Sequence, residues 1–188
     1  MASYCRFVSE HPEQVLHCAY HDTQYGFPLK DDAELFGRLI LEINQAGLSW
    51  TTILKKQEAF RRAFEGFEIA RVAEYGDADR ERLLADAGII RNRLKIDAVI
   101  ENARRLLVLQ KEFGSFRAWL DAHHPLDPEA WTRLFRKTFR FTGPEIVKEF
   151  LLSTGYLPGA HDEDCPVQAA VRAAGAPWTR TAGFRSLQ

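Results

Sequence analysis

Apolar residues return at helical spacing along most of the chain. The clearest case is the segment 32–46, whose apolar positions recur every three or four residues: Leu35, Phe36, Leu39, Ile40 and Ile43. Similar spacing predicts helices at about 49–64, 67–74, 77–86, 93–113 and 115–122, a short one from 129 and another from 144. No useful run alternates apolar and polar residues, so the predicted fold class is all-α.

Glycine, serine and proline mark the ends of these helices. Gly47 is expected just past the end of the segment 32–46, and Ser49 is expected to cap the next helix. Gly143 and Pro144 predict the start of the last strong helix, and Gly155 predicts its end. Residues 1–31 show no clear period and are expected to be irregular. The segment 123–128 is expected to be a linker, and the chain after 165 a short helix with a loose end.

Composition adds little to this picture. The 188 residues include 27% charged and 46% hydrophobic ones, which is ordinary for a globular protein, and the formal charge is −1. A near-neutral total argues neither for nor against nucleic acid, because a basic face can hide within it. The N-terminus has no apolar signal region and no run reaches the length of a membrane span, so we expect a cytoplasmic location.

The segment 42–50 combines a carboxylate with an aromatic side chain. Glu42 lies beside the apolar stripe of its helix, and Leu48 and Trp50 flank the break that follows. Such a set suits recognition of a flat heterocycle. Tyr20 is the only other polar candidate near this aromatic slot. The alternative is a plain corner between two helices, with Leu48 and Trp50 in the core and Glu42 on its rim.

A second candidate site lies between the helices predicted at 77–86 and 93–113. A tight hairpin there would point the backbone N–H groups of the second helix outward, next to Arg91, Arg93 and Lys95. That arrangement is suited to binding one DNA phosphate. The alternative is an ordinary corner between two helices.

Cysteine and histidine residues provide donors for a metal. His161 and Cys165 are four residues apart, and Cys5 and His21 could complete a tetrahedral set of two thiolates and two imidazoles. His17 and Cys18 are competing candidates, since Cys18 and His21 also have a plausible spacing. A closed set of four protein ligands would be structural and would join the two ends of the chain.

These motifs together resemble those of bacterial 3-methyladenine DNA glycosylase I, over roughly residues 4–165. The similarity rests on Ala19-Tyr-His-Asp22 with Tyr25-Gly26, on Gln45-Ala-Gly-Leu-Ser-Trp50, on Thr52-Ile-Leu-Lys-Lys56, on Asp86-Ala-Gly-Ile-Ile-Arg91, on Lys95-Ile96, on Glu101-Asn-Ala-Arg104, on Phe139-Arg-Phe-Thr-Gly-Pro144 and on Gly155-Tyr-Leu-Pro-Gly-Ala-His161. The block from Gln45 to Trp50 is the most specific of them.

The resemblance implies a helix-hairpin-helix DNA glycosylase fold, a monomeric protein and a structural zinc ion that clamps the termini together. The zinc ligands would be Cys5, His21, His161 and Cys165. A terminal lobe of 1–31 with 123–188 would pack on a helical lobe of 32–122 as one compact unit.

The same resemblance implies removal of 3-methyladenine, or a related alkylated base, from double-stranded DNA in base excision repair. Glu42 would hydrogen-bond the flipped base, Trp50 would stack on it, and Tyr20 would share the pocket, with Glu42 and Tyr20 as the catalytic candidates. The DNA contacts would come from the turn at the gap in the duplex and from the hairpin that anchors the backbone: Gly47, Leu48, Gly88, Ile90, Arg91 and Arg93.

Several positions depart from the pattern of the family. Ile43 stands where glycine is usual and Lys148 where tyrosine is usual, and a lysine facing the pocket would oppose a cationic base. Tyr25 replaces a tryptophan, and Arg6-Phe7 replaces a Gly-Trp pair. Ile43 and Lys148 motivate an alternative, a DNA-binding paralogue whose pocket has drifted. A third hypothesis is a metallohydrolase with an open metal site at His21 and Asp22.

Overall fold

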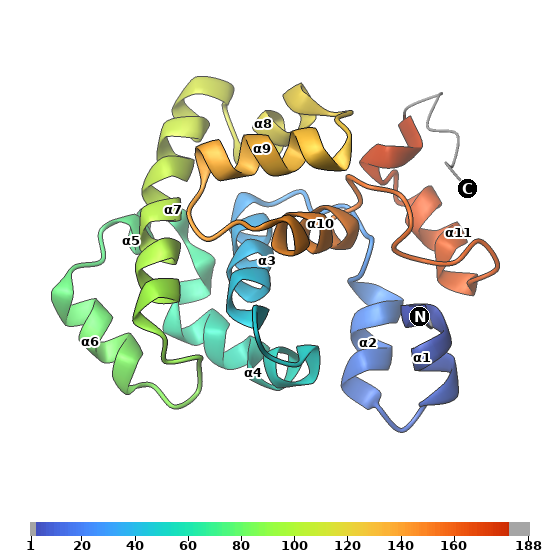
Figure 1. The fold of residues 1–188 in the computed structure, drawn as a ribbon, viewed down its shortest axis with the longest axis horizontal. Helices are drawn as coiled ribbons and strands as arrows, with labels where there is room; N and C mark the ends of the chain where they lie inside the picture. Colours follow the sequence, from blue (N-terminus) through green and yellow to red (C-terminus); the bar gives the residue numbers. More distant parts are fainter. Residues whose placement is uncertain (1–2, 181–188) are drawn as a thin grey trace.

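A computed structural model describes residues 3–180, and within this range the chain is helical and has no β-strand (Figure 1). In chain order the elements are α1 (Tyr4–Glu10), α2 (Val15–Thr23), α3 (Asp32–Gln45), α4 (Trp50–Ala63), η1 (Glu65–Phe67), α5 (Ile69–Ala73), α6 (Asp77–Ala85), α7 (Arg93–Phe113), α8 (Phe116–His123), α9 (Pro128–Thr138), α10 (Pro144–Ser153), α11 (Pro166–Ala173) and η2 (Pro177–Arg180). The all-α prediction is confirmed.

Helix α3 forms the centre of the molecule. It is buried from Leu35 to Asn44 and packs against α4, α7, α8 and α10, which surround it in Figure 1. The Phe67 ring presses so closely on this helix that a Cβ at Gly37 would lie 2.3 Å from its Cδ2. The central position of α3 fixes the residues that its last turn carries, Glu42 among them.

The predicted helix ends agree with the structure at the positions that matter for a site. Gly47 has φ of 81°, and the Ser49 hydroxyl accepts a hydrogen bond from the backbone N–H of Thr52 at the start of α4. Pro144 is the first residue of α10, and Gly155 follows that helix with φ of 77°. Local turn chemistry therefore sets both helix breaks.

The expectation that residues 1–31 are irregular is wrong, because α1 and α2 both lie in this segment. The buried positions of α2 are His17, Tyr20 and His21 rather than aliphatic residues. A search for aliphatic side chains at helical spacing misses such a helix. Its exposed residues include Val15 and Leu16, which further obscure the period.

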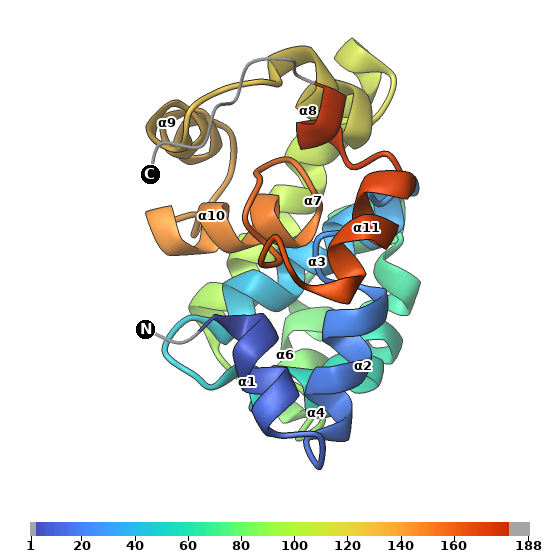
Figure 2. The same cartoon turned by 90° about the vertical axis from the view of Figure 1, so that its right-hand side faces the viewer.

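The two ends of the described chain lie side by side. Helix α11 sits next to α1 and α2 in both Figure 1 and Figure 2, and the Ser3 hydroxyl donates a hydrogen bond to Asp162. A short helix after residue 165 is confirmed, while the end of the predicted loose tail, 181–188, lies outside the described residues. The division into two lobes remains a prediction.

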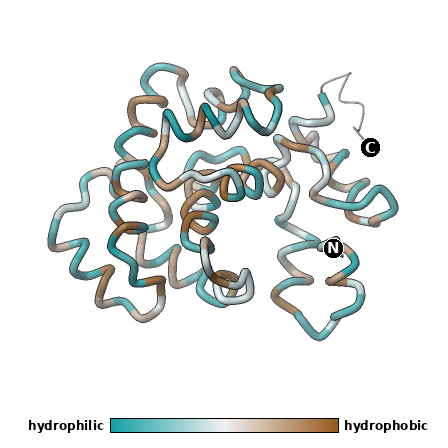
Figure 3. Tube along the Cα trace, in the orientation of Figure 1, coloured by the Kyte–Doolittle hydropathy of each residue, from teal (hydrophilic) through white to brown (hydrophobic). Residues whose placement is uncertain are grey.

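Hydrophilic and hydrophobic residues alternate around the helices, as Figure 3 shows. Among the helices of residues 3–180, none is both long and apolar enough to cross a membrane.

Candidate base-binding pocket and metal cluster

A pocket of 690 Å³ opens between the N-terminal helices, the end of α3, the start of α4 and helix α10. The residues that line it come from all of these elements: Ser3, Tyr4, Tyr20, Tyr25, Glu42, Gln45, Trp50, Glu145, Lys148 and Glu149. It contains the three residues predicted for base binding, Tyr20, Glu42 and Trp50. The structure therefore brings these three residues together in one pocket.

Aromatic rings form one wall of this pocket. The Tyr20 and Trp50 rings meet edge to face with centroids 5.2 Å apart, and Tyr25 lies 5.7 Å from Tyr20. Tyr4 packs edge to face on Tyr25 at 5.4 Å. Sequence analysis did not predict Tyr4 as part of the pocket, because its helix was not recognised. Flat rings on one wall favour the binding of a planar ligand.

Glu42 is the buried carboxylate of the pocket, with 4% of the residue exposed. It does not lie on an exposed rim, as the alternative interpretation expected. Burial raises its pKa to about 8, although the positive charge of Arg38 opposes this and the negative charge of Glu149 adds to it. No hydrogen-bond partner for its side chain exists within residues 3–180. A buried acceptor without a partner is costly to the fold and available to a ligand.

Arg38 holds Tyr20 in place. Its guanidinium donates hydrogen bonds to the Tyr20 hydroxyl at 3.3 Å and to the Ser153 carbonyl at 3.0 Å, and it lies 5.2 Å from the Tyr20 ring centroid. Burial raises the pKa of Tyr20 well above its usual value, so this hydroxyl remains protonated. Tyr20 is therefore a fixed, neutral part of the wall.

Charged residues of α10 face Glu42 across the pocket. Glu145, Lys148 and Glu149 all line it, and the Tyr25 hydroxyl donates a hydrogen bond to Glu149 at 3.4 Å. Burial raises the pKa of Glu149, and Lys148 opposes that shift. Sequence analysis singled out Lys148 but not Glu149 as a pocket residue. With three carboxylates and one ammonium group, the lining carries an excess of acidic groups.

Ile43 lies in the hydrophobic core with 1% exposure and does not line the pocket. Its branched side chain therefore does not narrow the pocket, although the position is usually glycine in the family. Glu42 and Ile43 are consecutive on a helix, so their side chains point in directions about 100° apart.

The turn after α3 presents Leu48 to solvent. Leu48 is 38% exposed rather than part of the core, and the Gln45 side chain donates a hydrogen bond to its carbonyl at 2.9 Å. Lys95 stabilises the same turn, because its Nζ donates hydrogen bonds to the carbonyls of Asn44 at 2.9 Å and Ala46 at 2.7 Å. Lys95 was expected in an anion site, but it is buried and instead binds the last carbonyls of α3.

The loop of residues 86–92 joins α6 to α7. The Asp86 carboxylate accepts a hydrogen bond from the Gly88 N–H at 2.7 Å, and the Asn92 side chain caps α7 at Lys95. Arg91 and Arg93 are exposed and form no ion pair within residues 3–180. Ile90 packs partly buried against the core. The loop thus combines free cationic groups with a fixed backbone.

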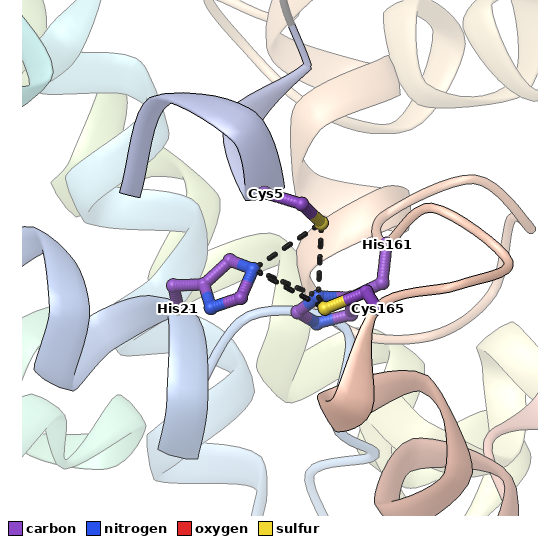
Figure 4. A group of neighbouring side chains, drawn as sticks. All are labelled: Cys5, His21, His161 and Cys165. Atoms are coloured by element: carbon purple, nitrogen blue, oxygen red, sulfur yellow. Dashed lines mark hydrogen bonds between the residues drawn. The ribbon is translucent and has the colours of Figure 1, made fainter. Parts of the chain in front are cut away.

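Four donor side chains from both ends of the chain converge beside the pocket (Figure 4). The ligand atoms of Cys5, His21, His161 and Cys165 all lie within 4.8 Å of one another. His21 Nε2 is 3.3 Å from the Cys5 sulfur, 3.2 Å from His161 Nδ1 and 3.8 Å from the Cys165 sulfur. The distances from His161 Nδ1 to the sulfurs of Cys5 and Cys165 are 3.6 Å and 3.7 Å. The group is a candidate metal-binding cluster.

The remaining ring nitrogens of this cluster have partners. His21 Nδ1 lies 2.7 Å from the Asp22 carboxylate, and His161 Nε2 donates to the Tyr25 carbonyl at 2.7 Å. Such bonds fix the tautomer of a ligating histidine. The competing donors lie elsewhere, since the Cys18 thiol contacts the His11 carbonyl at 3.8 Å and His17 contacts Thr51 at 2.8 Å.

Comparison with known proteins identifies the family. A model of the methyladenine glycosylase family matches residues 10–133. The chain is 38% identical over 170 residues to DNA-3-methyladenine glycosylase 1 of Escherichia coli strain K12, covering 80% of this chain and 89% of that protein. It is 32% identical over 190 residues to DNA-3-methyladenine glycosylase of Haemophilus influenzae, covering 90% of this chain and all (100%) of that protein.

Comparison with solved structures indicates the same family. 3-Methyladenine DNA glycosylase I from Staphylococcus aureus has a TM-score of 0.74 and 34% identity, covering 81% of this chain and 90% of that one. A variant of 3-methyladenine DNA glycosylase I with one tyrosine replaced by phenylalanine, in complex with 3-methyladenine, has a TM-score of 0.76 and 33% identity, covering 87% and 96%. The chain belongs to the methyladenine glycosylase family.

Proposed function

We propose that this protein is a monofunctional DNA glycosylase that hydrolyses the N-glycosidic bond of 3-methyladenine, or a related alkylated base, flipped out of duplex DNA. The observation that carries the proposal is the buried Glu42 carboxylate without a partner, set against the aromatic wall of Tyr20 and Trp50. Membership of the methyladenine glycosylase family and the 3-methyladenine complex of a related protein support it.

Hydrolysis of this bond needs little acid–base catalysis from the protein. Methylation at N3 makes adenine in DNA cationic, so the base is already a good leaving group, and water attacks a sugar with oxocarbenium character. The task of the pocket is to recognise the cation. Glu42 would accept a hydrogen bond from the edge of the base while Trp50 stacks on its face, and the excess of acidic groups would favour a positive charge.

The protonation state of Glu42 follows from its burial. With a pKa of about 8, the carboxyl group of the empty pocket is mostly neutral at pH 7. A cationic base would lower that pKa by direct attraction, so the proton would leave as the base enters. A neutral, unmethylated adenine would provide no such attraction. Selection of the lesion would then rest on charge as well as on stacking.

The duplex would be held at two places. Leu48 is exposed next to Gly47 on a turn that a hydrogen bond from Gln45 stabilises, and it would fill the gap that the flipped nucleotide leaves. The loop from Gly88 to Arg93, as a helix-hairpin-helix element with Ile90 anchored in the protein, would bind the backbone of the DNA through its N–H groups and the free Arg91 and Arg93 side chains.

The four-donor cluster fits a structural zinc ion. Tetrahedral geometry with the usual bond lengths places two nitrogen ligands about 3.4 Å apart and a nitrogen and a sulfur about 3.6 Å apart. The corresponding distances here are 3.2 Å and 3.3–3.8 Å. Bound by Cys5, His21, His161 and Cys165, zinc would hold the ends of the chain together. Four protein ligands leave no position for a reactive water, which argues against a metallohydrolase.

The test is release of free bases from N-methylated duplex DNA by wild type, Glu42→Gln and the control Glu34→Gln. Glu34 lies on the same helix and pairs with Arg61 at the surface. Wild type and Glu34→Gln should release 3-methyladenine, whereas Glu42→Gln should lose about 100-fold or more in rate. Binding of DNA without release of any methylated base would instead favour the paralogue with a drifted pocket, for which Lys148 in the lining is the supporting observation.

A further inference from the structure

Phe141 is a large apolar residue held at the surface in an unfavourable backbone conformation. Its φ is 59°, in the left-handed region that phenylalanine rarely adopts, and the residue is 40% exposed. A strained residue persists only when its surroundings enforce the conformation, and such residues gather at functional sites. The pocket described above does not include Phe141.

The surroundings that enforce this conformation are specific. Asn102 is fully buried, and its side-chain amide forms two hydrogen bonds with the backbone of Arg140, at 2.7 Å to the N–H and 3.0 Å to the carbonyl. On the other side, Thr142 is buried and its hydroxyl donates to the Phe139 carbonyl at 3.3 Å. Buried polar groups on both sides of Phe141 thus present its ring to solvent.

Lys95 links this ring to the turn that carries Leu48. The Lys95 ammonium lies 6.0 Å from the Phe141 ring centroid and donates to the carbonyls of Asn44 and Ala46. The buried Lys95 side chain therefore contacts both the Phe141 ring and the turn that carries Leu48. Figure 1 shows the segment before α10 and the turn after α3 on the side of the molecule that faces the viewer.

Free positive charges lie beside the ring. Arg136 and Arg140 line a surface pocket of 490 Å³ together with Phe141, and both are exposed. Neither forms an ion pair within the described residues, whereas Arg133, which lies on α9 with Arg136, is 3.8 Å from Glu129. An exposed aromatic ring flanked by unpaired arginines is the combination that binds stacked bases and phosphates.

We propose that Phe141 is a second apolar contact with the duplex, which stacks on the bases next to the gap while Arg136 and Arg140 bind the adjacent phosphates. The occupant is duplex DNA, because the charge of this surface and its connection to the Leu48 turn both favour it. The inference rests on the proposed function and adds to it a DNA-binding surface beyond the hairpin and the base pocket.

The test uses duplexes with a stable abasic analogue, so that binding is measured without base release. The variant Phe141→Asn removes the ring and keeps a residue that tolerates the left-handed conformation. The matched control is Phe113→Asn. Phe113 has a similar exposure, 39%, and is the last residue of α7, whereas Lys95 lies in the first turn of that helix. We expect Phe141→Asn to weaken binding about tenfold, Phe113→Asn to leave it unchanged, and Phe141→Tyr to retain most of the affinity.

Salt dependence provides a second measurement. The double variant Arg136→Ala/Arg140→Ala should reduce the slope of log affinity against log salt by roughly 2, because each arginine would release about one counterion. Unchanged affinity of Phe141→Asn with an unchanged melting temperature would overturn the proposal. So would a fall in its melting temperature with normal DNA binding, since Phe141 would then be structural.

Failure of the proposed function gives a different result. In that case wild type releases no methylated base, whatever the effect of Phe141 on binding to the abasic duplex. If wild type releases the base and Phe141→Asn binds and reacts normally, only the inference about Phe141 fails. Equal binding of abasic and unmodified duplexes by wild type would contradict a contact at the gap.

Discussion

Two clusters of polar side chains share helix α2, and they differ in how their polar atoms are paired. In the cluster of Cys5, His21, His161 and Cys165, the four ligand atoms lie within 4.8 Å of one another. The other ring nitrogen of each histidine has a hydrogen-bond partner outside the cluster. In the pocket, the Glu42 carboxylate has no hydrogen-bond partner within residues 3–180. Tyr20 and His21 are consecutive residues, one in each cluster.

This difference separates a structural role from a binding role. A cluster whose donors are all directed at one point contributes its free energy to folding when a metal occupies it. A carboxylate that is buried without a partner costs free energy in the empty protein and recovers it only with a ligand. The comparison can be tested by changing one cluster at a time.

The largest effect should come from Cys165→Ser. Loss of one ligand should release the bound metal and lower the free energy of unfolding by about 3–5 kcal/mol, which corresponds to a fall in melting temperature on the order of 10 °C. Metal content and thermal unfolding measure this. The control is Cys18→Ser, whose thiol lies outside the cluster and should be dispensable. Full metal content in Cys165→Ser would remove this residue from the ligand set.

The next effect concerns the cost of burying Glu42. Its pKa is about 8 in the folded protein and near 4.5 when unfolded, so the folded state binds an extra proton between these values. The unfolding free energy should therefore fall as pH rises from 4.5 to 8. Glu42→Gln should remove this term and be more stable than wild type above pH 8, by several kcal/mol.

Denaturant titrations at several pH values provide the measurement for Glu42. Because both proteins share every other titrating group, the difference between them isolates this one carboxyl. A constant difference from pH 5 to pH 8.5 would mean that the Glu42 pKa is normal, and the distinction between the two clusters would weaken.

A smaller effect is expected for Asp22→Asn. The Asp22 carboxylate accepts a hydrogen bond from His21 Nδ1 at 2.7 Å but is 56% exposed. Its loss should reduce metal affinity about tenfold, the lower end of the usual range for such partners, and leave base release unchanged at saturating metal. Competition with a chelator measures the affinity. A loss of base release at full metal content would mean that the two clusters are coupled through α2.

The smallest effect should follow Lys148→Gln. Removing this exposed positive charge from the pocket lining should raise the preference for alkylated over unmodified duplex about threefold at low salt. The ratio of the two affinities cancels any contact with phosphates, and Lys148→Arg serves as the control. A lower preference would show that Lys148 takes part in binding the lesion.

The sequence allowed the helices and their ends to be predicted where the signal was local. The aliphatic stripe of α3, the positive φ of Gly47 and the cap at Ser49 depend on a few neighbouring residues. Helix α2 was missed because histidine and tyrosine occupy its buried positions. Helix α1 was missed because it has only 7 residues, of which Val8 is buried. The resemblance to a known family, rather than spacing, selected Cys5 and His21 over His17 and Cys18.

Positions that depend on distant contacts could not be predicted. Lys95 appeared to belong to an anion site, but it is buried against carbonyls that are 49 and 51 residues away in sequence. Glu149 enters the pocket because α10 packs on α3. Phe141 looks like an ordinary core residue until its backbone conformation is known.

The separation of the four donors in sequence has a consequence for how the chain acquires its shape during synthesis. His21 and His161 are 140 residues apart. At ribosomal rates of about 5–20 residues per second, the first two donors wait on the order of 10 s for the other two. Tyr4 and Tyr20 are made together with Cys5 and His21, so we expect the aromatic wall to be fixed only after residues 161–165 have been made. The base-binding pocket is therefore expected to take its final form only after all of its own lining residues, between 3 and 149, have been made.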